Sequence, residues 1–405
     1  MPGDHPSSIF NLLMSKPGKL LLILAVLAGP LGAVYAPIPE EELGKALIVT
    51  VGGGIYHDDN IFGAPSNKQS SMVYRFAPSI DYNSSVTDQT FMSVSYDLTF
   101  DKVEDRPTNT DLISHLLALR VAHSFNPDSV LDVTNTFMIS ENPESLLPGL
   151  PLNTDQSFRS NQLDGILTKK LGEKMGLSLK GRSQLYAYDL TALAAQLDRH
   201  ELLLGVSADY AVSEATSMSG EYRFQDVAYD AGGSLKDKKS HFLLAGIDHA
   251  PSEQISLSMR LGLEQRNRSG APDDDAPRAE LMARYSYGEK SFLSGGYMYT
   301  IEEVSNVAAY TDVQVHRFYV NLQHAFSPKT IGSLFYNVEP STLLGRSGVT
   351  TDQDETTQRF GLALTMRPWE GWTISGTFDI DTTASGDPFR DLDRQRVGIN
   401  VSRSF

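Results

Sequence analysis

The chain has 405 residues, no cysteine and a formal net charge of -16 at pH 7, from 34 lysines and arginines against 50 acidic residues. The absence of cysteine excludes disulfides, thiolate metal ligands, a cysteine nucleophile and a lipoprotein anchor. The acidic balance argues against nucleic acid as a partner.

Residues 1–36 have the order of a secretory signal peptide, with two lysines before the apolar run 20–28 and small residues through Ala36. The run is too short to cross a bilayer as a helix, and no other stretch is long enough, which excludes a helical membrane protein. Met14 is an alternative start, and cleavage after Ala33 is an alternative to cleavage after Ala36. The expected parts are a signal peptide at 1–36, a short periplasmic segment at 37–46 and a strand-rich domain at 47–405.

Residues 47–405 repeat one motif, a hairpin of two alternating strands. Short polar turns, as at 126–128, 172–174 and 327–329, close the hairpins, and longer loops separate one hairpin from the next. Acidic residues lie mostly between the expected strands, as at 273–275, 302–303 and 352–355. The alternation predicts eighteen strands, at 47–56, 71–82, 90–102, 112–125, 129–139, 159–171, 175–188, 199–211, 217–228, 239–249, 254–266, 279–287, 291–301, 312–326, 330–338, 357–367, 372–381 and 394–405.

The two faces of each strand differ in polarity. In the strand at 254–266, Leu257, Met259 and Leu261 share one face, and Arg260 and Glu264 share the other. A soluble sandwich would bury the apolar face, whereas a membrane barrel turns it toward lipid and encloses the polar face. A propeller would need four short strands in each repeat. The sequence therefore predicts an all-β fold, a transmembrane antiparallel up-and-down β-barrel of about 18 strands, with short periplasmic turns and long extracellular loops.

The polar faces carry the candidate pore-lining residues. The basic ones are Arg75, Arg120, Lys180, Arg182, Arg223, Arg260, Arg266, Arg284, Arg317, Arg359 and Arg396. The acidic ones are Asp81, Asp97, Asp209, Glu221, Glu264 and Asp379. The excess of basic groups indicates a lumen that favours anionic solutes, because guanidinium groups bind carboxylates and phosphates bidentately. The alternative is that these charges bridge neighbouring strands and only stabilise the barrel.

The last strand has the pattern of an assembly signal. Its apolar positions are Val397, Ile399, Val401 and Phe405. An aromatic final residue on such a strand resembles the element that the barrel assembly machinery of bacterial outer membranes recognises, although Arg403 departs from that pattern. We expect this strand to pair with the first strand and to close the barrel, with Arg403 near the periplasmic rim.

The first expected strand is followed by Asp58, Asp59, Asn60, Ile61 and Phe62, and the second expected strand carries a proline, Pro78. In these features the first hairpin resembles that of the β-barrel porin 2 group of bacterial outer-membrane proteins. Members are often associated with exopolysaccharide or capsule export. The resemblance thus implies an outer-membrane channel for polysaccharide, with periplasmic export components as partners.

Other interpretations remain open at this stage. The three residues at 58–60 could bind a divalent cation through their oxygens or, as we favour, form an Asx turn at the end of the first strand. The barrel could be a general diffusion porin, a non-transporting adhesin or an assembly platform, and homo-oligomers are compatible with the sequence. No motif indicates a catalytic group, a metal site or a cofactor. Lipid and lipopolysaccharide of the outer membrane are the expected surroundings.

Overall fold

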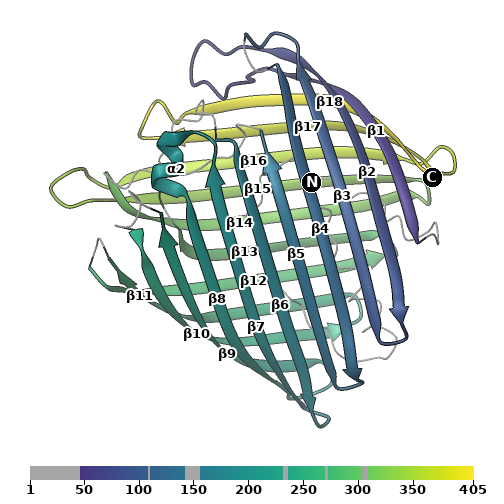
Figure 1. The fold of residues 1–405 in the computed structure, drawn as a ribbon, viewed down its shortest axis with the longest axis vertical. Coiled ribbons are helices and arrows are strands. Elements are labelled where there is room, and N and C mark those ends of the chain that lie inside the picture. Colours follow the sequence, from purple (N-terminus) through teal and green to yellow (C-terminus); the bar gives the residue numbers. More distant parts are fainter. Residues whose placement is uncertain are drawn as a thin grey trace.

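The computed structural model describes residues 46–107, 110–141, 156–230, 236–269, 272–302, 304 and 309–405. The expected signal peptide lies outside the described residues, as does all of the segment 37–46 except Ala46. Eighteen antiparallel strands form a single sheet that closes on itself (Figure 1). Among the described residues, no helix has the length and hydropathy needed to cross a membrane.

The strands follow one another around the barrel in chain order. Their bounds are β1 (Leu47–Asp58), β2 (Ser71–Thr87), β3 (Thr90–Val103), β4 (Asp111–Asn126), β5 (Ser129–Ser140), β6 (Phe158–Leu171), β7 (Met175–Tyr188), β8 (Arg199–Ala211), β9 (Thr216–Tyr229), β10 (Lys238–Ser252), β11 (Ile255–Arg268), β12 (Asp274–Gly288), β13 (Ser291–Glu302), β14 (Tyr310–Ser327), β15 (Thr330–Gly345), β16 (Gln353–Met366), β17 (Trp372–Ser385) and β18 (Leu392–Ser404). A short helix, α2 (Thr191–Leu197), lies between β7 and β8.

The first and last strands close the barrel. β1 pairs with β18 from Thr50 opposite Ser404 to Asp58 opposite Arg396, and it pairs with β2 on its other side. The backbone N–H of Phe405 also donates to the carbonyl of Val49 at 2.9 Å. Every strand therefore has two neighbours, and no row of backbone N–H and C=O groups is left as a free edge. The prediction that the terminal strand closes on the first strand is confirmed.

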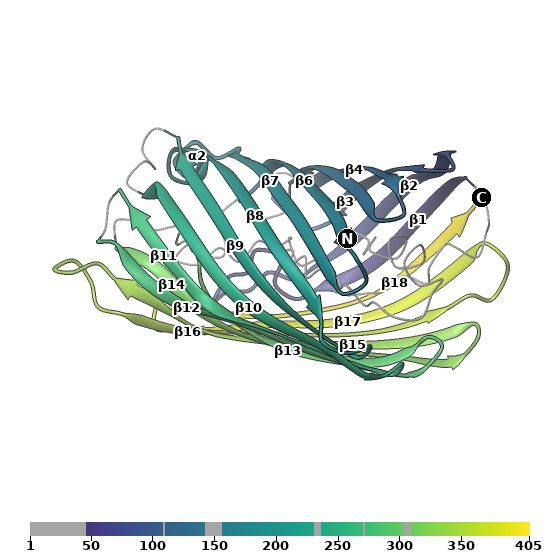
Figure 2. The same ribbon diagram turned by 90° about the horizontal axis from the view of Figure 1, so that it is seen from below.

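The two ends of the barrel differ in their connections. At one end, turns of two to five residues join the strands of each hairpin, from β2–β3 to β16–β17. The loops at the other end join one hairpin to the next, and α2 lies in one of them, at the same end of the barrel (Figures 1 and 2). Gly172 supplies the positive φ of 81° that the turn between β6 and β7 requires. Short turns at one end and long loops at the other confirm the predicted up-and-down arrangement.

All eighteen predicted strands are present, but several extend further toward the loop end than the sequence indicated. β15 continues through Pro340 to Gly345, and β12 begins at Asp274, before Pro277. Prolines and acidic residues had marked these stretches as loops, because proline cannot donate a hydrogen bond to the sheet. A membrane strand needs only about 9–11 residues, so the ends of longer strands lie beyond the apolar band and accommodate polar residues.

The acidic residues expected in loops are therefore partly in strands. Asp274, Glu302 and Glu355 all belong to the sheet, each at the loop end of its strand. The prediction placed them outside because it used polarity as the sign of a loop. In the barrel, Asp274 and Glu302 bind arginines of the inner wall, and Glu355 binds Arg390 of the loop between β17 and β18 at 2.6 Å.

The outer face of the barrel is apolar. In β11, Ile255, Leu257, Met259, Leu261 and Leu263 are all exposed, although they alternate with polar residues along the strand. In the neighbouring strand β10, Leu243 is 69 % exposed. A water-soluble protein does not leave a continuous apolar band of this kind exposed. A closed sheet with an apolar exterior is the form in which β-strands cross a membrane.

Candidate functional site

The inner wall of the barrel is the candidate site, because the polar faces of all the strands meet there. β2 illustrates the alternation: Tyr74 and Phe76 are exposed on the outer face, while Arg75 between them binds Asp101 of β3. In the strands that have exposed apolar side chains, the structure places each residue predicted to point inward on the opposite face, and Asp97 and Asp379 lie opposite the inward residues Ser79 and Arg396. What the sequence did not give is how these residues pair.

Four arginines of the wall bind an aspartate on a neighbouring strand. The shortest nitrogen-to-oxygen distances, each from an arginine to a carboxylate, are Arg75–Asp101 2.6 Å, Arg120–Asp132 2.6 Å, Arg182–Asp164 2.6 Å and Arg260–Asp248 2.7 Å. Three of the four, those of Arg75, Arg120 and Arg260, use two guanidinium nitrogens on both carboxylate oxygens. Each pair therefore joins two strands in addition to the backbone ladder.

Two further groups reach beyond a single strand pair. Glu221 of β9 accepts from Arg223 on the same strand at 2.8 Å and from Lys180 of β7 at 3.0 Å, across β8. Further around the sheet, Arg317 of β14 lies between Glu339 of β15, at 2.8 Å, and Glu302 of β13, at 3.4 Å. The inner charges thus form short networks along the wall.

Another network lies at the loop end of β11, β12 and β14. The Arg266 side chain has no exposed surface and binds Asp274 at 2.5 Å and Asp312 at 3.0 Å. Arg268 binds the same two carboxylates. Two arginines and two aspartates therefore share one site in which every charge has an opposite partner.

The remaining predicted residues of the wall have varied surroundings. Glu264 binds Arg278 at 3.1 Å, Arg396 binds Asp381 at 2.8 Å, and the Arg284 guanidinium lies 3.8 Å from the ring centre of Phe292. The others are placed by the register of the strands: Arg359 opposite Asp381, Asp379 opposite Arg396, Asp81 opposite Ser95, Asp97 opposite Ser79 and Asp209 opposite Ser219.

The inner wall holds more carboxylates than the sequence reasoning included. Asp101, Asp132, Asp164 and Asp248 all face inward, because each binds an inward arginine. Asp101 lies four residues after Asp97 in β3 and therefore on the same face of the strand, so the alternation alone could have identified it. The wall is therefore less basic than the predicted residues alone indicated. Acidic partners neutralise most of the arginines that suggested a basic excess.

Sequence reasoning also missed an aromatic cluster at the loop end. Leu193 and Leu197 of α2 are buried against Phe158 and Tyr188, whose strands β6 and β7 direct them inward. The Arg199 guanidinium lies 4.0 Å from the ring centre of Tyr186 beside this cluster. The loop between β7 and β8 thus folds over the inner wall. A helix of seven residues is too short to show helical periodicity in the sequence.

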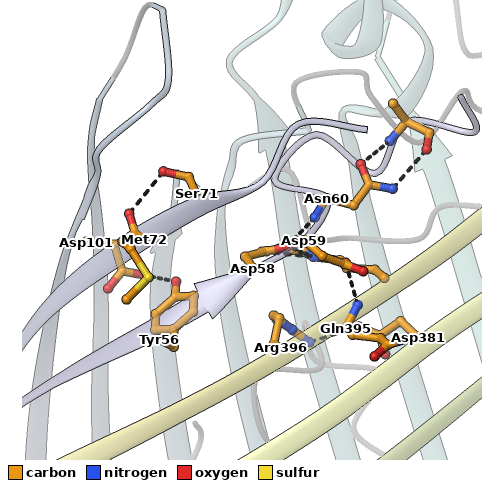
Figure 3. A network of polar contacts seen from close by, with 12 residues as sticks. Tyr56, Asp58, Asp59, Asn60, Ser71, Met72, Asp101, Asp381, Gln395 and Arg396 are labelled. Atoms are coloured by element: carbon orange, nitrogen blue, oxygen red, sulfur yellow. Dashed lines mark hydrogen bonds and ion pairs between the residues drawn. The ribbon is translucent and has the colours of Figure 1, made fainter. Parts of the chain in front are cut away.

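Asp58, Asp59 and Asn60, at the end of the first strand, lie at the seam between β1 and β18 (Figure 3). Asp58 accepts two bonds of 3.0 Å from Nε of Arg394 and a further one from Nη2, and it also accepts from the backbone N–H of Asn60 at 2.9 Å. Asp59 exchanges bonds with Gln395: its backbone N–H donates to the Gln395 carbonyl at 3.1 Å, and its carboxylate accepts from the Gln395 N–H at 2.6 Å.

Asn60 completes this arrangement. Its side chain is bonded to both backbone groups of Ala64 at 2.8 Å and donates to the carbonyl of Asp393 at 3.2 Å. The pattern of side-chain acceptors and backbone donors is that of the favoured Asx turn. Ile61 donates to the backbone of Gln69 at 2.9 Å, and Phe62 lies under the Arg106 guanidinium. Among the described residues, no group of three or more potential ligands could hold a metal ion.

The apolar positions of the terminal strand lie outside the barrel. Val397, Ile399 and Val401 of β18 are exposed on the outer face, and so is Phe405 just beyond the strand. Arg403 shares their parity, and its guanidinium lies 5.4 Å from the ring centre of Trp372 and 4.6 Å from that of Phe405. Arg403, Trp372 and Phe405 are at the turn end of the barrel, where an arginine can extend its charge toward headgroups.

Comparison with known proteins adds evidence on the fold. No family model and no curated protein matches the chain. Among solved structures, a BenF-like porin from Pseudomonas fluorescens Pf-5 is 12% identical, with a TM-score of 0.50 over 89% of this chain and 98% of that chain. OccK2 (OpdF) from Pseudomonas aeruginosa in complex with glucuronate is 12% identical, with a TM-score of 0.49 over 89% of this chain and 98% of that chain. Pseudomonas aeruginosa OpdK with vanillate is 11% identical, with a TM-score of 0.47 over 89% of this chain and 99% of that chain.

At such low sequence identities, a structural similarity is evidence for the fold alone. The similarity to the BenF-like porin supports an 18-stranded barrel fold for this chain. Three features agree with it: the closed sheet of 18 strands, the apolar exterior and the charged inner wall. The chain is therefore an outer-membrane β-barrel with the 18-stranded fold of a porin.

Proposed function

We propose that the protein is an outer-membrane channel through which small polar solutes diffuse. The observation that carries this proposal is a charged inner wall that solvent reaches. The side chains of Arg75, Lys180 and Arg182 point inward and keep 33 %, 31 % and 33 % of their surface exposed. Eighteen strands are also at the size where a barrel leaves an aqueous channel rather than filling with side chains.

The pairing of charges favours a general diffusion channel over an anion-selective one. Most of the predicted basic residues of the wall bind a carboxylate, so the net field that a passing ion meets is weaker than the arginines alone would create. The charges act mainly as bridges between strands. We expect the solutes to be small and polar, with little preference for the sign of their charge.

Membership of the β-barrel porin 2 group and passage of polysaccharide are finer proposals. They rest on the resemblance of the first hairpin. Two of the residues that carry this resemblance, Asp58 and Asn60, bind residues of β18 and so hold β1 and β18 together. Contacts with lipopolysaccharide, the barrel assembly machinery or periplasmic export components are likewise proposals. Loss of surface polysaccharide on deletion of the gene would support export, and unchanged polysaccharide would count against it.

The channel proposal is tested by conductance in planar lipid bilayers. The purified, folded barrel is expected to give stable current steps in the nanosiemens range, because an 18-stranded barrel leaves an aqueous path. A heat-denatured sample of the same preparation is the control. Folded protein that inserts without conducting would contradict a channel and favour an adhesin or an assembly platform.

The pair Arg182–Asp164 offers a test of how the wall charges act, since both side chains are about one third exposed. Removing one charge leaves the other unpaired in the lumen. We expect Asp164→Asn to shift the chloride-to-potassium permeability ratio toward chloride, and Arg182→Gln to shift it toward potassium, each by on the order of twofold at low salt. Reversal potentials across a salt gradient measure this ratio.

The matched control is Asp111→Asn, because Asp111 begins β4 on the outer face and pairs only loosely with Lys102, at 3.8 Å. Its ratio should equal that of the unmodified barrel. If Asp164→Asn and Arg182→Gln leave the ratio unchanged while the barrel still conducts, these side chains lie outside the path of the ions.

A further inference from the structure

The histidines of the barrel are confined to its outer face. Each one lies an even number of residues from the exposed apolar side chains of its strand, and therefore on the same face. Among the described residues, none points into the lumen. They are His57, His115, His123, His200, His241, His249, His316 and His324. Polar side chains on a lipid-facing surface are costly at mid-membrane, so their position along the strands is informative.

Six of these histidines form three pairs with the same spacing. β4, β10 and β14 each carry two histidines eight residues apart, and the outward positions between them are all apolar. Those positions are Leu117, Leu119 and Val121 in β4, Leu243, Ala245 and Ile247 in β10, and Phe318, Val320 and Leu322 in β14. The histidines thus lie in two rows, a loop-side row of His115, His241 and His316 and a turn-side row of His123, His249 and His324.

The distance between the rows matches the apolar thickness of the membrane. Eight residues of strand cover about 27 Å, which becomes about 20 Å along the barrel axis at the usual tilt of about 40°. The outward apolar band of such barrels is about 25 Å tall. Each row therefore lies close to one edge of the band, at the depth where lipid headgroups begin.

A hydroxyl group binds the same ring nitrogen in every histidine of the rows. In the loop-side row, Nδ1 lies 2.8, 2.8 and 3.0 Å from the hydroxyls of Tyr96, Tyr222 and Tyr297. In all three cases the tyrosine lies diagonally across the strand pair, two positions from the residue opposite the histidine. In the turn-side row, Nδ1 lies 2.9, 2.9 and 3.1 Å from hydroxyls of Thr90, Thr216 and Tyr287.

In the loop-side row, this geometry fixes which nitrogen faces the surroundings. A phenol is a stronger acid than a neutral imidazole, so each tyrosine donates to Nδ1 and leaves the ring proton on Nε2. No residue that the structure describes makes a hydrogen bond with Nε2 of these three histidines. Three oriented N–H donors therefore lie at the loop-side edge of the apolar band without an acceptor among the described residues.

We propose that the loop-side histidine row binds the phosphate groups of lipids in the outer leaflet. A headgroup phosphate is the acceptor present at that depth. Each Nε2 of the row donates to a phosphate oxygen, and the phenol at Nδ1 holds the ring in place, which limits the entropy lost on binding. The row then fixes the depth of the loop end of the barrel in the bilayer. This proposal does not depend on what the channel transports.

The test uses the full barrel in maltoside micelles, which contain no phosphate, with nitrogen-15 in its histidines. Short-chain phosphatidic acid is the probe, and the matching diacylglycerol, which lacks the phosphate, is the control lipid. We expect the Nε2 resonances of the loop-side row to shift with phosphatidic acid only. Replacing the loop-side row by phenylalanine should weaken the binding of phosphatidic acid by about tenfold, as loss of hydrogen bonds to a charged acceptor predicts.

Two sets of variants keep the result interpretable. His57→Phe with His200→Phe removes outward histidines that are outside the rows and should bind phosphatidic acid as the unmodified barrel does. Tyr96→Phe with Tyr222→Phe and Tyr297→Phe keeps the loop-side histidines but removes their hydroxyl partners, and should weaken binding even if the histidine variant does not fold. Equal shifts with diacylglycerol would overturn the proposal. So would loss of an oligomer in the loop-side row variants by sedimentation, which would assign this row to contacts between copies of the chain.

Discussion

Asp58→Ala is expected to lower the free energy of unfolding by about 3 to 5 kcal/mol, the usual cost of removing one partner of a buried ion pair. The side chain of Asp58 is 1 % exposed and that of Arg394 is 10 % exposed. Without the carboxylate, the Arg394 guanidinium loses the hydrogen bonds that it donates to Asp58 from Nε and Nη2. Urea unfolding of the barrel in lipid vesicles, followed by tryptophan fluorescence, measures the change.

Lys68→Ala supplies the matched control at the same seam. Lys68 binds Asp393 at 2.7 Å, but the two side chains are 32 % and 58 % exposed, so its loss should cost less than about 1 kcal/mol. The double variant Asp58→Ala with Arg394→Met should recover part of the loss, since the buried guanidinium is removed together with the carboxylate. Equal effects of Asp58→Ala and Lys68→Ala would show that the motif does not hold the seam.

Asp312→Ala is the second substitution with a large expected effect. Asp312 is buried between Arg266, which has no exposed surface, and Arg268, and its removal leaves two arginines with only Asp274 between them. We expect a loss of about 3 kcal/mol in the free energy of unfolding, measured in the same way.

The control for this cluster is Asp274→Ala. The Asp274 side chain is 38 % exposed, so water can replace it in part, and the cost should be near about 1 kcal/mol. Asp312→Asn keeps an oxygen acceptor for the guanidinium groups and should fall between the two alanine variants. If Asp274→Ala proved the more damaging of the two alanine variants, the order of burial in this cluster would not govern its stability.

The number and order of the strands could be predicted because alternation is a local property. Each strand shows its two faces within a few residues, as in the five exposed apolar residues of β11. The loop-side ends could not be predicted, because there the strands leave the apolar band and their outward positions become polar. β15 continues past Pro340 by pairing with β16, a contact that depends on another part of the chain.

For the candidate site, the sequence showed which way a residue points but not which residue it meets. Arg75 lies opposite Asp101 only because of the register between β2 and β3, and register is set by pairing between strands. The bond between Lys180 and Glu221 is still harder to foresee, because the two residues lie on strands that are not neighbours. A prediction from strand alternation alone therefore identifies inward charges without their partners. For this reason it overestimated the basic character of the lumen.

The similarity of the first hairpin to a porin group pointed to residues that matter for a reason other than transport. Asp58, Asp59 and Asn60 bind Arg394, Gln395 and the backbone of Asp393, all in or beside β18. Neither the motif nor its spacing indicates this partner, because the two segments are more than 300 positions apart in the sequence. Closure of the barrel is what brings them together.

The seam also bears on the order of folding. Each hairpin pairs segments close in sequence, whereas the contact between Asp58 and Arg394 closes a loop of 336 residues and carries a larger entropic cost. Contacts of such high sequence separation form late. Until they form, β1 and β18 each present an unpaired edge on which another chain could add. The ion pair at the seam is therefore a marker of a completed barrel, and the interval before it forms is the period when the protein is most open to aggregation.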